Sequence, residues 1–404
     1  MTQKHYLALD LGAESGRAIV GTLAGGKLSL SETHRFANSP LNTPGGLRWD
    51  VNSLWREIKV GIAHSARAFA LQSLAVDTWG VDFALLDENG ALLGNPYHYR
   101  DARTDGMLEE AFRRVPQPQI FARTGIQFMQ INTLYQLLSM RLASDPHLAA
   151  ARTFLTIPDL FNHWLCGSLV CEFTNATTTQ CFDPLSRDWA FPLLQAMDIP
   201  LHLFPGVCEP GTNLGALLPD VALETGAGSL PVIAPACHDT GSAVAAVPAQ
   251  NSHFAWISSG TWSIMGAEVA QPNLTPQALA SNFTNEGGVF GTWRLSRNIM
   301  GLWLVQECKR TWGLSYDDLT RLAAEAPPFL AVIDPDHPNF LHPGNMPEKI
   351  CQFCRQTGQP VPQTQGQITR VVLESLALKY RFVLARLDEL LGTRLDPLHI
   401  IGGG

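Results

Sequence analysis

The sequence has little charge and no long hydrophobic run. Only 16% of its 404 residues are charged, and 36 acidic residues outnumber 28 basic ones. This balance argues against a nucleic-acid or anionic-membrane partner, because either would require a basic face. No apolar run approaches the roughly 18 residues that a membrane span needs. The N-terminus, MTQKHYLALDLG, enters a strand pattern without a signal peptide. We therefore expect a cytoplasmic protein.

The sequence also lacks a recognisable set of metal-ligating cysteines. There are eight cysteines, and Cys351-Gln-Phe-Cys354 is a lone CxxC. A zinc site needs two further ligands, but no second CxxC or HxxxH is present. In a cytosolic chain such thiols are usually free. We therefore predict neither a metal nor a redox centre at Cys351 and Cys354.

The length suggests two or more domains, and the strand patterns suggest that they are alike. Residues 6–36 read as apolar runs broken by Gly-containing turns, which predicts an antiparallel meander. Residues 253–266, HFAWISSGTWSIMG, repeat the strand, polar turn and strand of LALDLGAESGRAIV at 7–20. This similarity favours an internal repeat in which each domain opens with a hairpin.

Other segments have clear local patterns. Residues 74–93 predict a second strand pair, and their Asn89-Gly90 dipeptide is a strong turn signal. Residues 133–143 are helical in pattern, as are 368–391, where Gly392 is a good helix end. A short strand at 398–401 then leads to three final glycines, so we expect the sequence to stop within a strand–turn–helix motif.

Two Gly- and Ser-containing turns are candidates for binding phosphate. Asp10-Leu-Gly-Ala-Glu-Ser-Gly-Arg17 offers backbone N–H groups, a hydroxyl and a guanidinium, and Asp10 could hold hydrated Mg²⁺. Ser258-Ser-Gly-Thr-Trp-Ser263 is the second such turn. An ordinary polar hairpin is the alternative for each. Gly21–Lys27 matches GxxxxGK, but Leu28 replaces the hydroxyl residue of a Walker motif, so we expect only a turn there.

The stretch PACHDTGS, at 235–242, places a carboxylate where a buried strand gives way to a helix. Ligands bind at the carboxyl ends of strands in open α/β sheets. If a phosphate lies there, Asp239 can accept the proton of an attacking hydroxyl. His238 is the stronger base by its ordinary pKa, but positioning matters more than basicity in phosphoryl transfer. The alternative for Asp239 is a helix N-cap.

Two further stretches could contact a ligand. In Asp77-Thr-Trp-Gly-Val-Asp82, Trp79 and the bare Gly80 would suit a stacked polyol, although a tryptophan in the core is the commoner arrangement. Asn298 precedes an apolar helix that contains Gln306, and its default role is a helix N-cap. Solvated surface is the alternative for Gln306.

Together these stretches resemble the FGGY carbohydrate kinases. The matching segments include ALDLGAESGRA, AVDTWGVDFALLD, EFTNATTTQ, CHDTGSAVAA, ISSGTWSIMG, RNIMGLWLVQEC and LHIIGGG, and they run in the family's order from residue 7 to the end. The resemblance implies an α/β fold of two actin-like ATPase (ribonuclease H-like) domains around a central cleft. Residues 1–245 would form the N-terminal domain, with the sugar site, and 246–404 the nucleotide-binding C-terminal domain.

The resemblance further implies transfer of the γ-phosphate of ATP to O1 of L-rhamnulose, with Mg²⁺ as cofactor. L-Fuculose and L-xylulose are alternative acceptors, and an inactive ligand-binding relic of the fold is a further alternative. We expect a monomer. By position, the resemblance assigns Asp239 as the catalytic base and Asp10 to magnesium through water; sugar contacts to Gly80, His238, Asp239, Thr240 and Asn298; and ATP contacts to Ala13, Glu14, Ser15, Gly16, Arg17, Thr261, Gln306, Gly402, Gly403 and Gly404.

Family members continue well past the segment that matches LHIIGGG. We therefore expect the second domain of this chain to be truncated, with part of its adenosine pocket missing.

Overall fold

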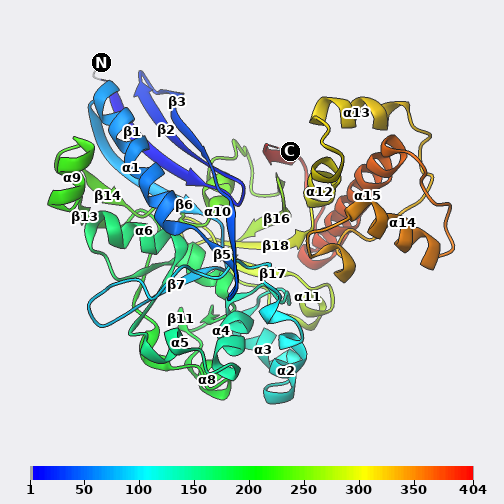
Figure 1. Ribbon diagram of the computed structural model, residues 1–404, viewed down its shortest axis with the longest axis horizontal. Helices are drawn as coiled ribbons and strands as arrows, with labels where there is room; N and C mark the ends of the chain where they lie inside the picture. The colour runs from blue at the N-terminus through cyan, green and yellow to red at the C-terminus, as the bar shows by residue number, and fades with distance from the viewer. Residues whose placement is uncertain (1–2, 404) are drawn as a thin grey trace. The chain divides into compact units, whose positions relative to one another are not determined.

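The computed structural model describes residues 3–403 and divides the chain into two compact units. The first unit comprises Met1–Ala246 and Val269–Arg294, and the second comprises Val247–Glu268 and Leu295–Gly404. Figure 1 shows the chain coloured along its length. The assignment of a sugar-binding domain to 1–245 and a nucleotide-binding domain to 246–404 stays a prediction.

The first unit is built on a six-stranded sheet in the order β13-β14-β6-β1-β2-β3. The predicted meander is confirmed, because β2 pairs antiparallel with both β1 and β3. On the other side, β6 pairs parallel with β1 and with β14. The strands are β1 (Lys4–Leu11), β2 (Ser15–Ala24), β3 (Lys27–Ala37), β6 (Leu71–Thr78), β13 (Asn213–Ala216) and β14 (Pro231–Ile233).

Helix α1 (Val51–Ala68) packs on β1, β2 and β3 (Figure 1). It begins after Asp50, whose side chain accepts a hydrogen bond from the Ser53 amide at 3.0 Å, as an N-cap should. Its buried residues Leu54, Ile58 and Ile62 recur every four positions and so share one face. That apolar face covers one side of the sheet.

The expected strand pair at 74–93 is confirmed around its turn, because Leu86 bridges antiparallel to Leu92 and the Leu93 amide donates to the Leu85 carbonyl at 2.9 Å. Strand β6 pairs with β1 and β14, whereas β7 (Phe83–Leu86) pairs antiparallel with β8 (Thr153–Thr156). The chain changes direction between β6 and β7, where Val81 has a left-handed φ of 66°. The turn signal in the same stretch is confirmed, because Gly90 has a φ of 77° and Asp87 accepts hydrogen bonds from the amides of Asn89 and Ala91.

Shorter elements complete the first unit. Helix α4 confirms the helical pattern predicted at 133–143. The remaining elements are β4 (Pro40–Thr43), β5 (Gly46–Trp49), α2 (Met107–Arg114), α3 (Gln117–Thr124), α4 (Thr133–Leu142), α5 (Pro146–Ala150), α6 (Ile157–Cys166), β9 (Cys171–Glu172), α7 (Phe173–Ala176), β10 (Phe182–Asp183), β11 (Asp188–Trp189), α8 (Phe191–Ala196), β12 (Val207–Cys208), α9 (Pro219–Thr225), α10 (Asp239–Ala245), α11 (Pro276–Ala280) and β17 (Thr284–Gly287).

The second unit contains strands in the order β18-β16-β15-β19 and four longer helices. The predicted helix at 368–391 is confirmed as α15, which ends at Gly392 with a φ of 63°. The predicted strand at 398–401 is confirmed as β19. The elements are β15 (Ala255–Ser259), β16 (Ser263–Val269), β18 (Trp293–Ile299), α12 (Trp303–Trp312), α13 (Tyr316–Glu325), α14 (Met346–Gln356), α15 (Gln365–Leu391) and β19 (Leu398–Gly402).

The two units share a strand arrangement, as the sequence repeat predicts. In the first, β1 pairs antiparallel with the next strand, β2, and parallel with β6. In the second, β15 pairs antiparallel with the next strand, β16, and parallel with β19. The candidate phosphate turns at 10–17 and 258–263 are therefore equivalent hairpins of one repeated motif.

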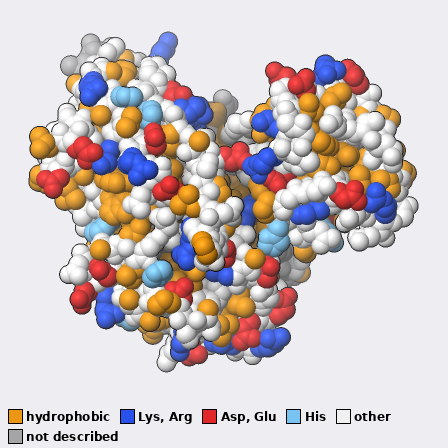
Figure 2. Space-filling view, viewed as in Figure 1, with side chains coloured by type: hydrophobic (Ala, Val, Ile, Leu, Met, Phe, Trp, Pro, Cys, Tyr) orange, Lys and Arg blue, Asp and Glu red, His pale blue; other side chains and the backbone are white. Residues whose placement is uncertain are grey.

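The protein surface and the helices match two expectations from the sequence, namely that it has no strongly basic face and no membrane-spanning segment. On the face shown in Figure 2, Lys and Arg side chains are interspersed with Asp and Glu. Within residues 3–403, none of the helices combines the length and apolarity needed to cross a bilayer.

Candidate active site

The turn between β1 and β2 carries the first group of candidate ATP contacts, Ala13 to Arg17. The Gly12 amide donates to the Ser15 carbonyl at 2.9 Å and closes the turn. The buried Asn38 fixes it, because its side chain donates to the Gly12 carbonyl and its amide to the Glu14 carbonyl, both at 2.9 Å. The five predicted residues thus belong to one turn, held in place by Asn38, and to the first residues of β2. Their contact with ATP stays a prediction.

Gly16 has a packing role that the sequence did not reveal. A Cβ on Gly16 would lie 2.3 Å from the Phe36 ring, so a side chain cannot fit there unless that ring moves. The absence of a side chain is therefore explained by the β2–β3 contact, without any ligand.

Two residues assigned to different ligands contact each other. The Arg17 guanidinium forms an ion pair with the Asp10 carboxylate, which lies opposite it across the β1–β2 ladder. Arg17 was predicted to bind phosphate and Asp10 to hold magnesium. Because the guanidinium has several N–H groups, it can keep this pair and still donate to a phosphate.

Asp10, Asp77 and Asp239 form an acidic cluster. Asp77 lies next to Asp10 in the parallel register of β1 and β6. Burial raises the pKa of Asp77 well above its usual range, and the charges of Asp10 and Asp239 raise it further. Asp77 was not among the predicted site residues, although its place at the end of a strand beside Asp10 could have suggested it.

The acidic cluster fits a hydrated Mg²⁺ better than a directly caged one. Magnesium prefers carboxylate and phosphate oxygens and usually keeps several waters. In the part of the chain that the structure describes, no three metal-ligating side chains converge as a set of direct ligands. Asp10 and its neighbours could therefore hold magnesium through water and nucleotide phosphates, as the sequence suggested for Asp10.

Asp239 is the first residue of α10, so the N-cap alternative is wrong. His238 occupies the cap position, and Asp239 Oδ1 accepts hydrogen bonds from the amide and the hydroxyl of Thr240 at 2.5 and 3.1 Å. Burial raises the pKa of Asp239, whereas the adjacent His238 lowers it. A third of the side-chain surface, 34%, remains exposed. A reachable carboxylate with a raised pKa is a better proton acceptor than an ordinary one.

A buried carboxylate holds the backbone that leads to Asp239. Glu172 Oε2 accepts a hydrogen bond from the Cys237 amide at 3.0 Å, and Thr174 Oγ1 accepts one from the His238 amide at 3.1 Å. On the other side, the Thr78 amide donates to the Cys237 carbonyl at 2.9 Å. Residues 237–238 are therefore fixed from β6 and from the start of α7.

This arrangement predicts that the protein loses stability as the pH rises. Burial raises the pKa of Glu172 from 4.5 to about 8 and that of Asp159, whose carboxylate accepts from the Glu172 amide, to about 7. An acid whose pKa is higher in the folded protein stabilises the fold below its unfolded pKa, and this contribution disappears as the pH rises through the folded pKa. The free energy of unfolding should fall by on the order of a few kcal/mol between pH 4.5 and 8.

Glu172→Gln should flatten that decline, most clearly around pH 7 to 8, because the amide cannot ionise. The measurement is urea unfolding at several pH values, with the exposed Glu88→Gln as control. Parallel pH profiles for the wild type and Glu172→Gln would show that Glu172 does not carry the effect.

Gly80 and Trp79 differ in accessibility. Trp79 is only 5% exposed, its ring centroid lies 4.2 Å from that of Trp49, and its Nε1 donates to Asp82 at 3.0 Å. It is therefore a core residue, and the structure does not support its stacking on a polyol. The neighbouring Gly80 is partly exposed, and a Cβ there would lie 3.0 Å from Thr178.

The candidate ATP contacts of the second unit lie around one turn. Thr261 lies between β15 and β16, and its carbonyl accepts from the Trp303 amide at the start of α12 at 3.0 Å. Gln306 is on the first turns of α12, and its buried Oε1 has no hydrogen-bond partner among residues 3–403. Gly402 pairs with Ser259 at the end of β15, and the exposed Gly403 follows. Gly404 lies outside the described residues.

Asn298 is not a helix N-cap. It lies within β18, and α12 begins only at Trp303, after a turn in which Gly301 has a φ of 49°. The glycine ends the extended segment before the helical pattern starts. A sugar contact by Asn298 stays a prediction.

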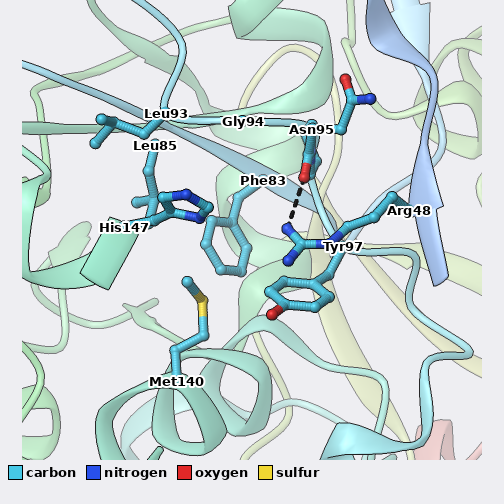
Figure 3. Close-up of a pocket in the computed structure, with 10 residues that line it drawn as sticks. Arg48, Phe83, Leu85, Leu93, Gly94, Asn95, Tyr97, Met140 and His147 are labelled. Atoms are coloured by element: carbon cyan, nitrogen blue, oxygen red, sulfur yellow. Dashed lines mark hydrogen bonds between the residues drawn. The ribbon is translucent and has the colours of Figure 1, made fainter. Parts of the chain in front are cut away.

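Two other features are the Cys351/Cys354 pair and a small pocket in the first unit. Cys351 and Cys354 are buried in α14, and both thiols are free. The pocket in Figure 3 lies in the first unit, where the Arg48 guanidinium is 3.3 Å from the centre of the Tyr97 ring and donates to the Asn95 carbonyl at 2.8 Å. Its volume of about 20 Å³ suits a water molecule and not a sugar.

Comparison with known proteins matches both parts of the chain. Residues 5–246 match the N-terminal domain of the FGGY family of carbohydrate kinases, and residues 255–404 match the C-terminal domain. A rhamnulokinase from Bacteroides thetaiotaomicron is 44% identical over 406 residues, and one from Oceanobacillus iheyensis is 40% identical over 404. Both alignments cover 100% of this chain, with 83% and 86% of the two relatives.

Solved structures show the same fold at low identity. A xylulose kinase from Lactobacillus acidophilus has a TM-score of 0.78 at 16% identity, over 99% of this chain and 81% of that one. Plasmodium falciparum glycerol kinase with ADP has a TM-score of 0.74 at 13% identity, over 99% and 82%. The fold is therefore that of the two-domain sugar kinases, as predicted.

The chain belongs to the FGGY family of carbohydrate kinases. It spans 83% of the length of the first relative, which does not establish a truncated second domain. That expectation stays a prediction.

Proposed function

We propose that this protein transfers the γ-phosphate of ATP to O1 of L-rhamnulose, giving L-rhamnulose 1-phosphate and ADP. Family membership supports a phosphotransferase that acts on a carbohydrate, and relatives 40–44% identical over the whole chain are rhamnulokinases. The observation that carries the proposal is Asp239: a reachable carboxylate with a raised pKa, held at the start of α10 on a backbone fixed from two sides.

In the proposed reaction, the O1 hydroxyl of the ketose attacks the γ-phosphorus of ATP. A bond forms between O1 and phosphorus, the bond from phosphorus to the β,γ-bridging oxygen breaks, and the O1 proton passes to Asp239. The loose transition state of phosphoryl transfer makes the position of the base more important than its strength. The fixed backbone at 237–238 supplies that positioning.

The other residues have binding roles in this proposal. Gly80, His238, Thr240 and Asn298 would contact the sugar, and the turns around Ser15 and Thr261 would contact ATP. Thr240 is buried and its hydroxyl already donates to Asp239, so its part is to orient that carboxylate. When bound, Mg²⁺ would neutralise charge on the phosphates, held through water by Asp10. We further propose that the protein is a cytoplasmic monomer.

The acceptor sugar is tested by comparing ketoses at saturating Mg-ATP. We expect kcat/KM for L-rhamnulose to exceed that for L-fuculose and L-xylulose by about tenfold or more, because even one methylene more or less in a pocket changes transition-state binding by about 1–3 kcal/mol. Phosphorus NMR of the product should place the phosphate on O1. A higher kcat/KM for another ketose would reassign the substrate within the same chemistry.

An inactive ligand-binding relic is the alternative from another class. It predicts that calorimetry detects ATP or ketose binding while no ADP forms with any of the three sugars. The intact cluster of Asp10, Asp77 and Asp239 favours the kinase, because binding alone does not need a proton acceptor.

A further inference from the structure

A buried ion pair in the first unit contacts His238. Glu286, in β17, and Arg294, which is the last residue of the first unit and lies near the start of β18, have side chains that are only 5% and 0% exposed. Arg294 Nη2 is 3.2 Å from Glu286 Oε2, and Arg294 Nε donates to the Gly287 carbonyl at 2.8 Å. Burial opposes ionisation of Glu286, but the positive charge of Arg294 and a contact with His238 outweigh it and lower the pKa of Glu286. The pair is therefore ionised and electrically balanced.

The geometry at His238 distinguishes between its two neutral tautomers. Arg294 Nη2 lies 3.0 Å from His238 Nδ1 in hydrogen-bond geometry. Glu286 Oε2 is 3.2 Å from the same nitrogen, yet within residues 3–403 it accepts no hydrogen bond. A guanidinium can only donate, so the hydrogen bond from Arg294 requires Nδ1 to be an acceptor without a proton. In the neutral ring the proton then lies on Nε2, which is 3.5 Å from Asp239 Oδ1.

We propose that the Glu286–Arg294 pair is a positioning device that holds His238 as its Nε2–H tautomer, so that the imidazole turns a donor towards Asp239. The proposal rests on the proposed function, in which Asp239 is the base. An Nε2–H directed towards Oδ1 helps to orient the Asp239 carboxylate for the incoming hydroxyl. The other tautomer would direct a lone pair towards Oδ1 and could not orient it in this way.

The tautomer can be measured directly in the wild-type protein, independently of any kinase activity. The chain carries twelve histidines. Nitrogen-15 labelling of their rings, with His238→Gln to assign the signal, reports which nitrogen carries the proton. We expect an unprotonated Nδ1 and a protonated Nε2 at neutral pH. A protonated Nδ1 would overturn the proposal, whatever the assay of ADP formation shows.

A second experiment separates positioning from structural support. Arg294→Met leaves Glu286 buried without its cation, so it should lower both stability and kcat. The double variant Glu286→Leu/Arg294→Met removes both buried charges. Replacing both partners of a buried ion pair by apolar residues often leaves the stability unchanged. We expect the double variant to regain thermal stability but keep a kcat reduced roughly 10- to 100-fold, with the KM for ATP unchanged.

Recovery of kcat together with stability in the double variant would show that the pair only supports the fold, and would contradict the proposal. If either variant fails to fold, the wild-type spectrum still decides the tautomer. A wild-type protein that forms no ADP with any ketose but shows the Nε2–H tautomer would reject the proposed function and leave the positioning of His238 intact.

Discussion

Asp239→Asn should abolish sugar-dependent ADP formation while the protein stays folded. Removing a general base typically costs 10²- to 10⁴-fold in rate, and asparagine has no basic oxygen to replace it. The Asn side-chain oxygen can still accept the hydrogen bonds from the Thr240 amide and hydroxyl. The change also relieves like-charge repulsion with Asp10 and Asp77. We therefore expect the free energy of unfolding to stay within about 1 kcal/mol of the wild-type value.

The measurement is kcat in a coupled ADP assay, alongside thermal unfolding of the same samples. Asp220→Asn is a matched control, since Asp220 is also an aspartate in the first turn of a helix, α9, but is exposed. We expect the control to keep wild-type kcat. A rate within tenfold of the wild type for Asp239→Asn would exclude Asp239 as the essential base.

Gly301→Ala should disrupt the turn that contains Thr261, which we propose to contact ATP, and should lower the stability of the second unit. A Cβ at Gly301 would lie 2.5 Å from the Ser263 amide nitrogen and 2.7 Å from the Thr261 carbonyl oxygen, both backbone atoms that cannot rotate away. Its φ of 49° adds strain of roughly 1–3 kcal/mol for a residue with a side chain. The turn that contains Thr261 must then move, so we expect the KM for ATP to rise about tenfold or more.

Gly313→Ala is the matched control. Gly301 precedes α12 and Gly313 follows its last turn, also with a left-handed φ, of 67°, but the space around the Cβ position of Gly313 is open. It shares the backbone strain and lacks the contact. In urea unfolding, Gly301→Ala should therefore lower the free energy of unfolding by roughly 1–3 kcal/mol more than Gly313→Ala does. Equal losses and an unchanged KM for ATP would show that the turn tolerates the methyl group.

The local elements that sequence predicted well are those with a strong repeating pattern. The meander at 6–36, the hairpin at 253–266 and the long helix that ends at Gly392 all have apolar residues at the spacing that their structure requires. The hairpin at Asn89-Gly90 was also predicted correctly, whereas the sheet partners of β6 and β7 are not visible in the sequence. Adjacent strands usually pair, but the left-handed backbone at Val81 sends β7 to a different sheet.

The site residues also divide into some that the sequence reveals and others that only the structure reveals. Asp239 was found from the sequence because PACHDTGS shows a carboxylate where an apolar strand pattern gives way to a helix. Glu172, Glu286 and Arg294 were missed, because each acts through a buried contact with residues more than 45 positions away. The start of α12 was placed too early, since the pattern NIMGLWL does not show that Asn298 is still in a strand.

The most direct test of the account is ADP release from Mg-ATP by the wild-type chain, with and without L-rhamnulose. The account predicts ADP only when the sugar is present, with one sugar phosphate formed for each ADP. No sugar-dependent ADP with L-rhamnulose, L-fuculose or L-xylulose would contradict the kinase function proposed for this chain.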